Sequence, residues 1–141
     1  MKKVKSCGVF CLTTTEPKFF LLMKHPHRYD LPKGHIEPGE TELECALREL
    51  FEETTIKREQ VCIDNNFRFE SVYYPRYKRF GNKKVEKTLI IFLGRVEKTL
   101  KIISSEHYSY EWIEWNPPHN LQNQIIDSLL LSVEQFLKTE I

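Results

Sequence analysis

Residues 41–54 constrain the fold most, because their pattern predicts a helix with two unlike faces. Thr41 is suited to cap the free amides at the start, and Glu44 follows three residues later, as a capping box requires. Apolar residues recur at helical spacing along one face, namely Leu43, Ala46, Leu47 and Leu50. We therefore expect that face to pack on a core and the opposite face to be polar.

The polar face gathers carboxylates in its second half, where Glu49, Glu52 and Glu53 project along one side. Like charges this close repel one another and raise each other's pKa unless a cation neutralises them. Hard oxygen ligands favour Mg²⁺, with Mn²⁺ as an alternative. The simpler interpretation is a solvated acidic face on which Arg48 pairs with Glu44 and Glu52.

The preceding loop decides between these interpretations, because it extends the pattern at fixed spacing. Gly34, five residues, Glu40, seven residues, Arg48-Glu49-Leu50, one residue and Glu52-Glu53 follow in order. This order resembles the Nudix hydrolase motif, Gly-x5-Glu-x7-Arg-Glu-U-x-Glu-Glu-x-Gly-U, in which U is a bulky aliphatic residue. One position departs, since Thr55 replaces the last Gly. A Gly just after a helix is usually left-handed, a conformation that costs a β-branched residue roughly 1–2 kcal/mol.

The resemblance implies a Mg²⁺-dependent enzyme that cuts a phosphoanhydride bond. The metal ligands that it implies are the Gly34 carbonyl, Glu49, Glu52 and Glu53. Arg48 is then expected to orient the glutamates, and Glu40 to support the loop. The general base is expected to be Glu53 or Glu106, and the choice between them stays open.

Two segments extend the likeness to the asymmetric diadenosine tetraphosphate hydrolases. Residues 31–40 read Leu-Pro-Lys-Gly-His-Ile-Glu-Pro-Gly-Glu, and residues 105–112 read Ser-Glu-His-Tyr-Ser-Tyr-Glu-Trp. A long polyphosphate requires cations, and a purine requires a flat aromatic partner. The substrate-binding residues that we expect are Lys33, His35, Tyr74 and Lys87. The cations at positions 76–84 are either part of this site or a solvated hairpin tip.

Other functions remain open. A different Nudix substrate would use the same helix with another pocket, for example a nucleoside triphosphate, an RNA 5′ end or a diphosphoinositol polyphosphate. A non-catalytic nucleotide-binding module would normally have lost the carboxylates that this chain keeps. The net charge of +1 gives no bulk attraction to nucleic acid or membrane. The expected partner is therefore a small nucleotide, with an RNA 5′ end as the exception.

The whole chain predicts an α+β fold, and the resemblance implies an α/β/α sandwich in which a loop-helix-loop lies against a mixed sheet. With 141 residues and no repeat or linker, we expect one domain over residues 1–141. Strands are expected at residues 5–12, 18–23, 61–63, 67–74, 84–96 and 110–115. Residues 24–39 are expected to be a loop, and 79–82 a turn. A terminal amphipathic helix is marked by Leu121, Ile125, Leu129, Val133 and Phe136 or Leu137.

The cysteines and the apolar segments indicate the compartment. Cys7, Cys11, Cys45 and Cys62 form no C-x2-C pair, so we expect reduced, structural thiols. The N-terminal apolar run is short, and no apolar stretch approaches the roughly 20 residues that span a bilayer. We expect a cytoplasmic protein.

Overall fold

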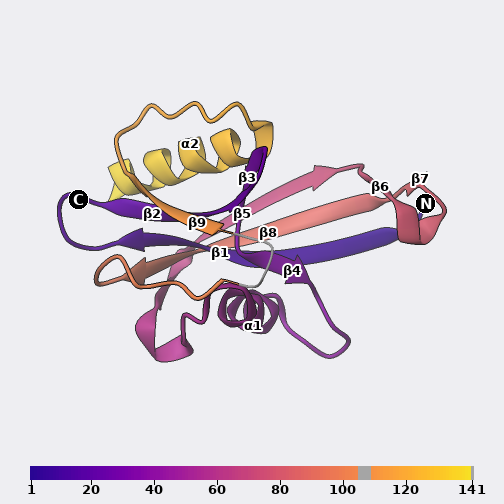
Figure 1. The fold of residues 1–141 in the computed structure, drawn as a ribbon, viewed down its shortest axis with the longest axis horizontal. Helices are drawn as coiled ribbons and strands as arrows, with labels where there is room; N and C mark the ends of the chain where they lie inside the picture. Colours follow the sequence, from indigo (N-terminus) through magenta and orange to yellow (C-terminus); the bar gives the residue numbers. More distant parts are fainter. Residues whose placement is uncertain (105–108, 141) are drawn as a thin grey trace.

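The protein is described here by a computed structural model that covers residues 1–104 and 109–140. A mixed sheet lies between two helices (Figure 1). The strands are β1 (Lys3–Thr13), β2 (Phe19–His25), β3 (Arg28–Asp30), β4 (Lys33–His35), β5 (Cys62–Tyr73), β6 (Arg76–Tyr77), β7 (Lys83–Lys84), β8 (Glu86–Val96) and β9 (Ser109–Glu114). The helices are α1 (Glu42–Thr54) and α2 (Gln124–Thr139), with short 3-10 turns at Arg58–Gln60 and Lys78–Phe80.

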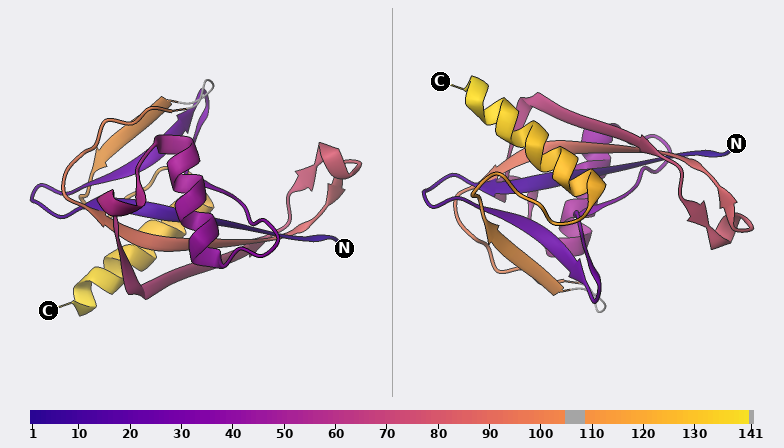
Figure 2. Two further views of the ribbon diagram at one scale, coloured as in Figure 1. Left: turned by 90° about the horizontal axis from the view of Figure 1, so that it is seen from below. Right: turned by 90° about the horizontal axis from the view of Figure 1, so that it is seen from above.

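The main sheet has the order β3-β2-β1-β8-β5, with β4 paired to β1 and β9 paired to β2. The central strands β1 and β8 run parallel from Lys3↔Glu86 to Thr13↔Val96, whereas the other pairs are antiparallel. The smaller β6–β7 sheet belongs to a segment that we call the arm, residues 75–85. The arm projects from the body beside the N-terminus (Figure 2).

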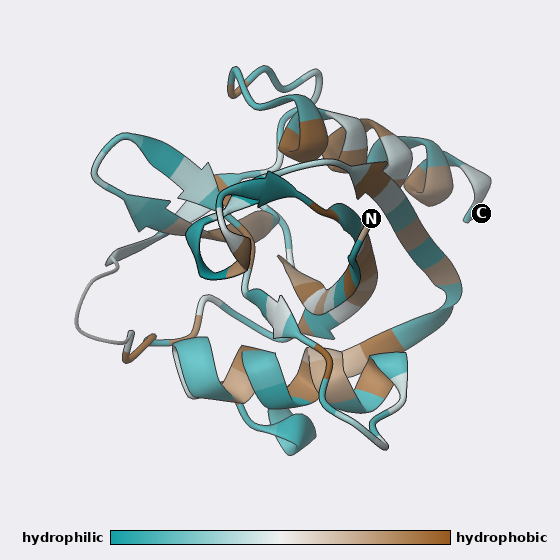
Figure 3. Ribbon diagram, turned by 90° about the vertical axis from the view of Figure 1, so that its right-hand side faces the viewer, coloured by the Kyte–Doolittle hydropathy of each residue, from teal (hydrophilic) through white to brown (hydrophobic). Residues whose placement is uncertain are grey.

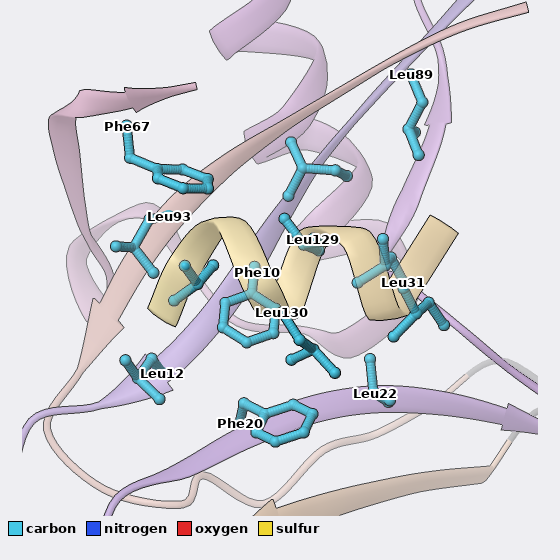
Figure 4. Packing of buried hydrophobic residues seen from close by; sticks show 13 residues of the cluster. Phe10, Leu12, Phe20, Leu22, Leu31, Phe67, Leu89, Leu93, Leu129 and Leu130 are labelled. Carbon is cyan, nitrogen blue, oxygen red and sulfur yellow. The ribbon is translucent and has the colours of Figure 1, made fainter. Parts of the chain in front are cut away.

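Each face of the sheet has its own hydrophobic core, because side chains alternate along β1. Phe10 and Leu12 pack with α2 on one face (Figure 4), whereas Val9 and Cys11 pack with α1 on the other. Hydrophobic and hydrophilic residues alternate along both helices (Figure 3), as amphipathic covering helices require. The mixed sheet and the two covering helices confirm the expected α/β/α arrangement.

The loop expected at residues 24–39 is wrong in part, since it contains β3 and β4. Strand β4 forms by pairing with β1, in the register Ser6↔His35 and Gly8↔Lys33. Gly8 permits this approach, because a Cβ there would lie 2.3 Å from the Pro32 carbonyl oxygen. The pairing depends on a distant strand, so the composition of the loop did not indicate it.

Three further boundaries differ from expectation. The strands expected at 61–63 and 67–74 are one strand, β5, with a register shift between Ile63 and Arg68. The turn expected at 79–82 lies within the longer arm. Helix α2 begins at Gln124, after the Asn123 cap, so Leu121 lies before it and packs on the core from outside the helix.

No helix in the described ranges is long and apolar enough to cross a membrane. The four cysteines are free thiols, and all except Cys62 are buried.

Candidate active site

The two ends of α1 fix the rotation of its carboxylates. At the start, Thr41 Oγ1 accepts a hydrogen bond from the Glu44 amide at 3.1 Å, and a Glu44 carboxylate oxygen accepts one from the Thr41 amide at 2.8 Å. This capping box confirms the expected start. At the end, Thr55 adopts φ 66°, and its amide donates to the Phe51 carbonyl at 2.8 Å. Thr55 therefore takes the left-handed conformation that the motif glycine would supply.

Arg48 connects the loop to the helix. Its guanidinium donates to both oxygens of Glu40, at 2.6 and 2.9 Å, and to Glu52 at 3.0 Å. A third contact joins Arg48 to the carbonyl of His35 at 3.1 Å. Hydrogen bonds from Arg48 lower the pKa of Glu40 to about 2. Glu40 is thus a permanent anion that holds Arg48 against the carboxylate face.

The fold buries the carboxylates of Glu49 and Glu53 close to other negative charges. The Glu49 side chain is 14% exposed, and burial, aided by the charge of Glu52, raises its pKa. Burial raises the pKa of Glu53 to about 8, and the charge of Glu49 adds to the rise. A backbone amide, that of Lys33, donates to Glu53 at 3.2 Å. A cation near Glu49 and Glu53 would lower both pKa values.

Gly34 brings the loop backbone against these carboxylates. A Cβ at Gly34 would lie 1.8 Å from a Glu49 oxygen, so a side chain would displace the carboxylate. The Gly34 carbonyl accepts a contact from the Cys45 thiol at 3.4 Å. Glycine at position 34 therefore lets the loop backbone lie directly against the Glu49 carboxylate.

The donor chemistry at this place suits a divalent cation, although the side chains are not gathered around one. In residues 1–104 and 109–140, no three His, Cys, Asp or Glu side chains converge closely enough to hold a metal ion. Glu52 is half exposed and turned to Arg48. Glu49 and Glu53 are neighbouring hard oxygen donors on α1, Glu49 lies against the Gly34 backbone, and the two carboxylates carry raised pKa values that a cation would lower.

A cavity of about 370 Å³, the size of small-molecule sites, has in its wall Lys33, whose amide donates to Glu53. Its wall includes Arg28, Tyr29, Lys33, Tyr73, Tyr77 and Lys87. Lys87 is 7% exposed, and its ammonium lies 5.7 Å from the Tyr73 ring and 5.8 Å from the Tyr77 ring. Burial lowers the pKa of Lys87 to about 8, and the charge of Lys33 contributes. The wall thus combines aromatic surfaces with a buried cation.

Lys87 makes no direct contact with a protein anion among the described residues, although the charge of Asp30 in the same cavity wall acts on it. Within the described part of the chain, neither a hydrogen bond nor an ion pair joins it to another residue. Lys33, in contrast, pairs with Asp30 at 3.2 Å. Because a buried charge without a partner is costly, the cavity favours an anionic ligand.

The carboxylate helix, the glycine loop and their spacing agree with one protein family. The model of the NUDIX domain matches residues 2–130. This chain belongs to the NUDIX family. Its relatives include proteins named asymmetrical bis(5′-nucleosyl)-tetraphosphatase. The protein from Rattus norvegicus is 40% identical over 122 residues, which are 78% of each chain. The protein from Mus musculus is 42% identical over 89 residues, which are 62% of this chain and 56% of the mouse protein.

Solved structures of other proteins share the fold. The crystal structure of a C. elegans Ap4A hydrolase binary complex aligns with a TM-score of 0.79 at 28% identity, over 96% of this chain and 98% of that one. The MutT protein from Methanosarcina mazei Go1 aligns with a TM-score of 0.63 at 23% identity, over 98% of this chain and 97% of that one. The second likeness shows the fold alone.

Most of the expected site residues lie together at the edge where β4 meets α1. Lys33, His35 and Lys87 are on the cavity side of β4 and β8, whereas Glu49 and Glu53 are on α1. His35 contacts the arm, since its Nδ1 lies 3.0 Å from an Arg79 nitrogen. Glu106 lies outside the described residues.

Tyr74 is placed differently from its expected position. Its side chain is 51% exposed and does not line the cavity, whereas that of Tyr73 does. Tyr73 pairs across strands with Lys87, and Phe67 and Phe69 precede it at the same parity on β5. Strand alternation was the signal for Tyr73, because the odd-numbered aromatic residues turn inward.

Proposed function

We propose that this NUDIX hydrolase cleaves a dinucleoside tetraphosphate asymmetrically, to a nucleoside triphosphate and a nucleoside monophosphate. The observation that carries the proposal is the buried Lys87 in an aromatic cavity whose wall includes Lys33, the residue whose amide donates to Glu53 on α1. The names of the rat and mouse relatives and of the C. elegans structure support the same substrate class.

We infer that Mg²⁺, or Mn²⁺ in its place, is held by Glu49, Glu53, the Gly34 carbonyl and Glu52. When bound, such an ion neutralises phosphate oxygens and acidifies water. Glu40 holds Arg48 in place, and Arg48 in turn donates a hydrogen bond to Glu52. Glu52 would leave this hydrogen bond to join the other ligands when the ion binds. Lys33 and Lys87 orient the phosphate chain by charge, and the cavity tyrosines face the base.

Glu53 is our candidate for the general base. Burial raises the pKa of Glu53 to about 8, so its deprotonated form is a stronger base toward water than an ordinary carboxylate. Its second role, as a ligand, would lower that pKa, so Glu106 stays the alternative base.

We also infer a cytoplasmic protein whose partner is a small nucleotide. The free, mostly buried thiols are typical of a reducing compartment, and the net charge of +1 offers no general affinity for nucleic acid.

The test is to incubate the full chain with diadenosine tetraphosphate and Mg²⁺, with and without chelator, and to separate the products by ion exchange. We expect ATP and AMP, and no products with chelator. Glu52→Gln should lower kcat by two orders of magnitude or more, by the scale of ~10²–10⁴ for a lost catalytic group, while Glu97→Gln, an exposed control, should not.

Two equivalents of ADP, or equal rates with chelator, would contradict the proposal. Failure to cleave this substrate would direct the same assay to nucleoside triphosphates, RNA 5′ triphosphates and diphosphoinositols.

A further inference from the structure

The arm, whose Pro75 and Tyr77 line the cavity, carries a second group of cations. Its strands pair Arg76↔Lys84 and Tyr77↔Lys83, and the Asn82 amide closes the turn by donating to the Tyr77 carbonyl at 2.9 Å. Residues 75–85 contain five cations and no carboxylate: Arg76, Lys78, Arg79, Lys83 and Lys84. The arm projects beyond the helices (Figure 2), so its five cations are not explained by packing of the arm against the body of the protein.

Arg79 reaches from the arm to β4. One guanidinium nitrogen lies 3.0 Å from His35 Nδ1, and the guanidinium carbon lies 5.2 Å from the Tyr77 ring and 4.8 Å from the Phe80 ring. Because a guanidinium is a donor only, Nδ1 must accept, and His35 is the neutral tautomer with its proton on Nε2. The Arg79 guanidinium is thus positioned by the Tyr77 and Phe80 rings and by the neutral His35 imidazole. No carboxylate pairs with it in residues 1–104 and 109–140.

Tyr77 lies between two cations that no carboxylate within residues 1–104 and 109–140 contacts directly. Lys87 approaches its ring at 5.8 Å, and Arg79 at 5.2 Å. The charge of Arg79 contributes to the lowered pKa values of Lys87 and His35, so the three groups lie within electrostatic reach of one another. An anion bound across Tyr77 would relieve this repulsion.

The strand register orders these groups by level along β1, with β4 and β8 paired to opposite edges of that strand. Lys33 pairs with Gly8, His35 with Ser6 and Lys87 with Val4, so they occupy successive levels about 6.6 Å apart on one face of the sheet. Lys33 is the level nearest Glu53, to which its amide donates. The arm follows at the far end, after Glu86↔Lys3. Arg79 reaches back from the arm to the His35 level, so the cations extend from the Glu53 end of β4 to Arg79.

We infer that Arg79 binds the distal phosphates of a chain whose other end lies at the carboxylates, and that the arm thereby makes the site selective for longer phosphate chains. This inference rests on the proposed function, since it assigns the part of that substrate site which measures chain length. The class of ligand is a linear polyphosphate, free or esterified to nucleosides.

The test compares Arg79→Gln with Lys84→Gln, which removes the same charge from an exposed position on the same arm. Inorganic tripolyphosphate and pyrophosphate are titrated into each full-length variant in chelator, so that no hydrolysis is required. Arg79→Gln should weaken tripolyphosphate binding about tenfold, the scale of one charge-assisted hydrogen bond, and pyrophosphate binding less than about twofold. Lys84→Gln should change either constant less than about twofold.

Equal losses for both probes, or equal losses in both variants, would overturn the inference. With diadenosine tetraphosphate, Arg79→Gln should raise KM and leave kcat unchanged, and Arg79→Lys should restore part of the affinity. A fall in kcat at constant KM would contradict a role in binding. If the wild type fails to cleave the dinucleotide while the titrations differ as expected, the proposed function fails and the length-measuring site stands.

Discussion

At the residue scale, the family pattern and the structure indicate different aromatic side chains for stacking on the base. The resemblance assigns base stacking to Tyr74, whereas the structure turns Tyr73 into the cavity beside Lys87. We expect Tyr73→Leu, which keeps apolar bulk, to raise KM for a dinucleotide about tenfold, because base–aromatic stacking contributes ~1–3 kcal/mol. Tyr74→Leu should leave KM nearly unchanged. Steady-state kinetics of the two variants provide the measurement, and a larger effect from Tyr74→Leu would restore the first assignment.

The site residues that sequence could indicate are those fixed by spacing on one helix. Glu49, Glu52 and Glu53 follow from helical geometry, and Arg48 follows from its neighbours. Arg79 could not be identified in this way, because its contact with His35 joins two segments 44 positions apart and depends on how the arm folds back. Lys78 and Lys83 are also cations of the arm, and no local sequence feature distinguishes Arg79 from them.

At the element scale, the end of α1 offers a direct test of backbone strain. Thr55 is left-handed with φ 66°, a conformation that glycine adopts without a Cβ penalty. We therefore expect Thr55→Gly to raise the free energy of unfolding by about 1 kcal/mol, after the glycine entropy cost is subtracted. Lys57→Gly is the matched control, because Lys57 has an ordinary φ of −85°. This substitution should lower the free energy of unfolding by roughly 0.5–1 kcal/mol. Urea unfolding measures both, and destabilisation by both substitutions would refute the strain.

Elements with local signals were predictable, and elements made by distant pairing were not. The capping box of α1 and the apolar run of β1 are readable in a few consecutive residues. Strand β4 forms because Gly8 lets the loop approach β1, and β5 continues through its register shift because β8 pairs on both sides of it. Leu121 fits the apolar period of α2 yet lies outside it, since Asn123 caps the helix and the Leu121 amide donates to Asp127.

At the scale of the whole molecule, the fold separates the two kinds of charge that the reaction needs. Helix α1 presents carboxylates from one side of the sheet edge, while β8 and the arm present cations on the face that α2 covers. Strand β4 is the boundary, with the Lys33 amide on Glu53 and the Lys33 side chain in the cavity wall. A polyphosphate that crosses β4 therefore meets both sets without either set being neutralised by the other.

The burial of Glu53 on α1 makes the free energy of unfolding depend on pH in the absence of metal. Folding raises the pKa of Glu53 from its ordinary 4.5 to about 8, so the folded chain binds this proton more tightly than the unfolded chain does. The contribution of Glu53 to stability is then complete below about pH 4.5 and is lost as the pH rises through about 8. Glu53→Gln resembles the protonated carboxyl and should escape this loss.

We expect the two proteins to melt alike at pH 5 in chelator, and Glu53→Gln to melt roughly 5 °C higher at pH 8.5. Saturating Mg²⁺ should reverse the order at pH 8.5, because an ion that binds the folded carboxylates stabilises the wild type by mass action and has lost a ligand in the variant. Thermal melts at the two pH values, with chelator and with Mg²⁺, measure all four states. A difference between the proteins that is the same at pH 5 and pH 8.5 would show that Glu53 is an ordinary carboxylate, and the electrostatic case for a cation beside it would fail.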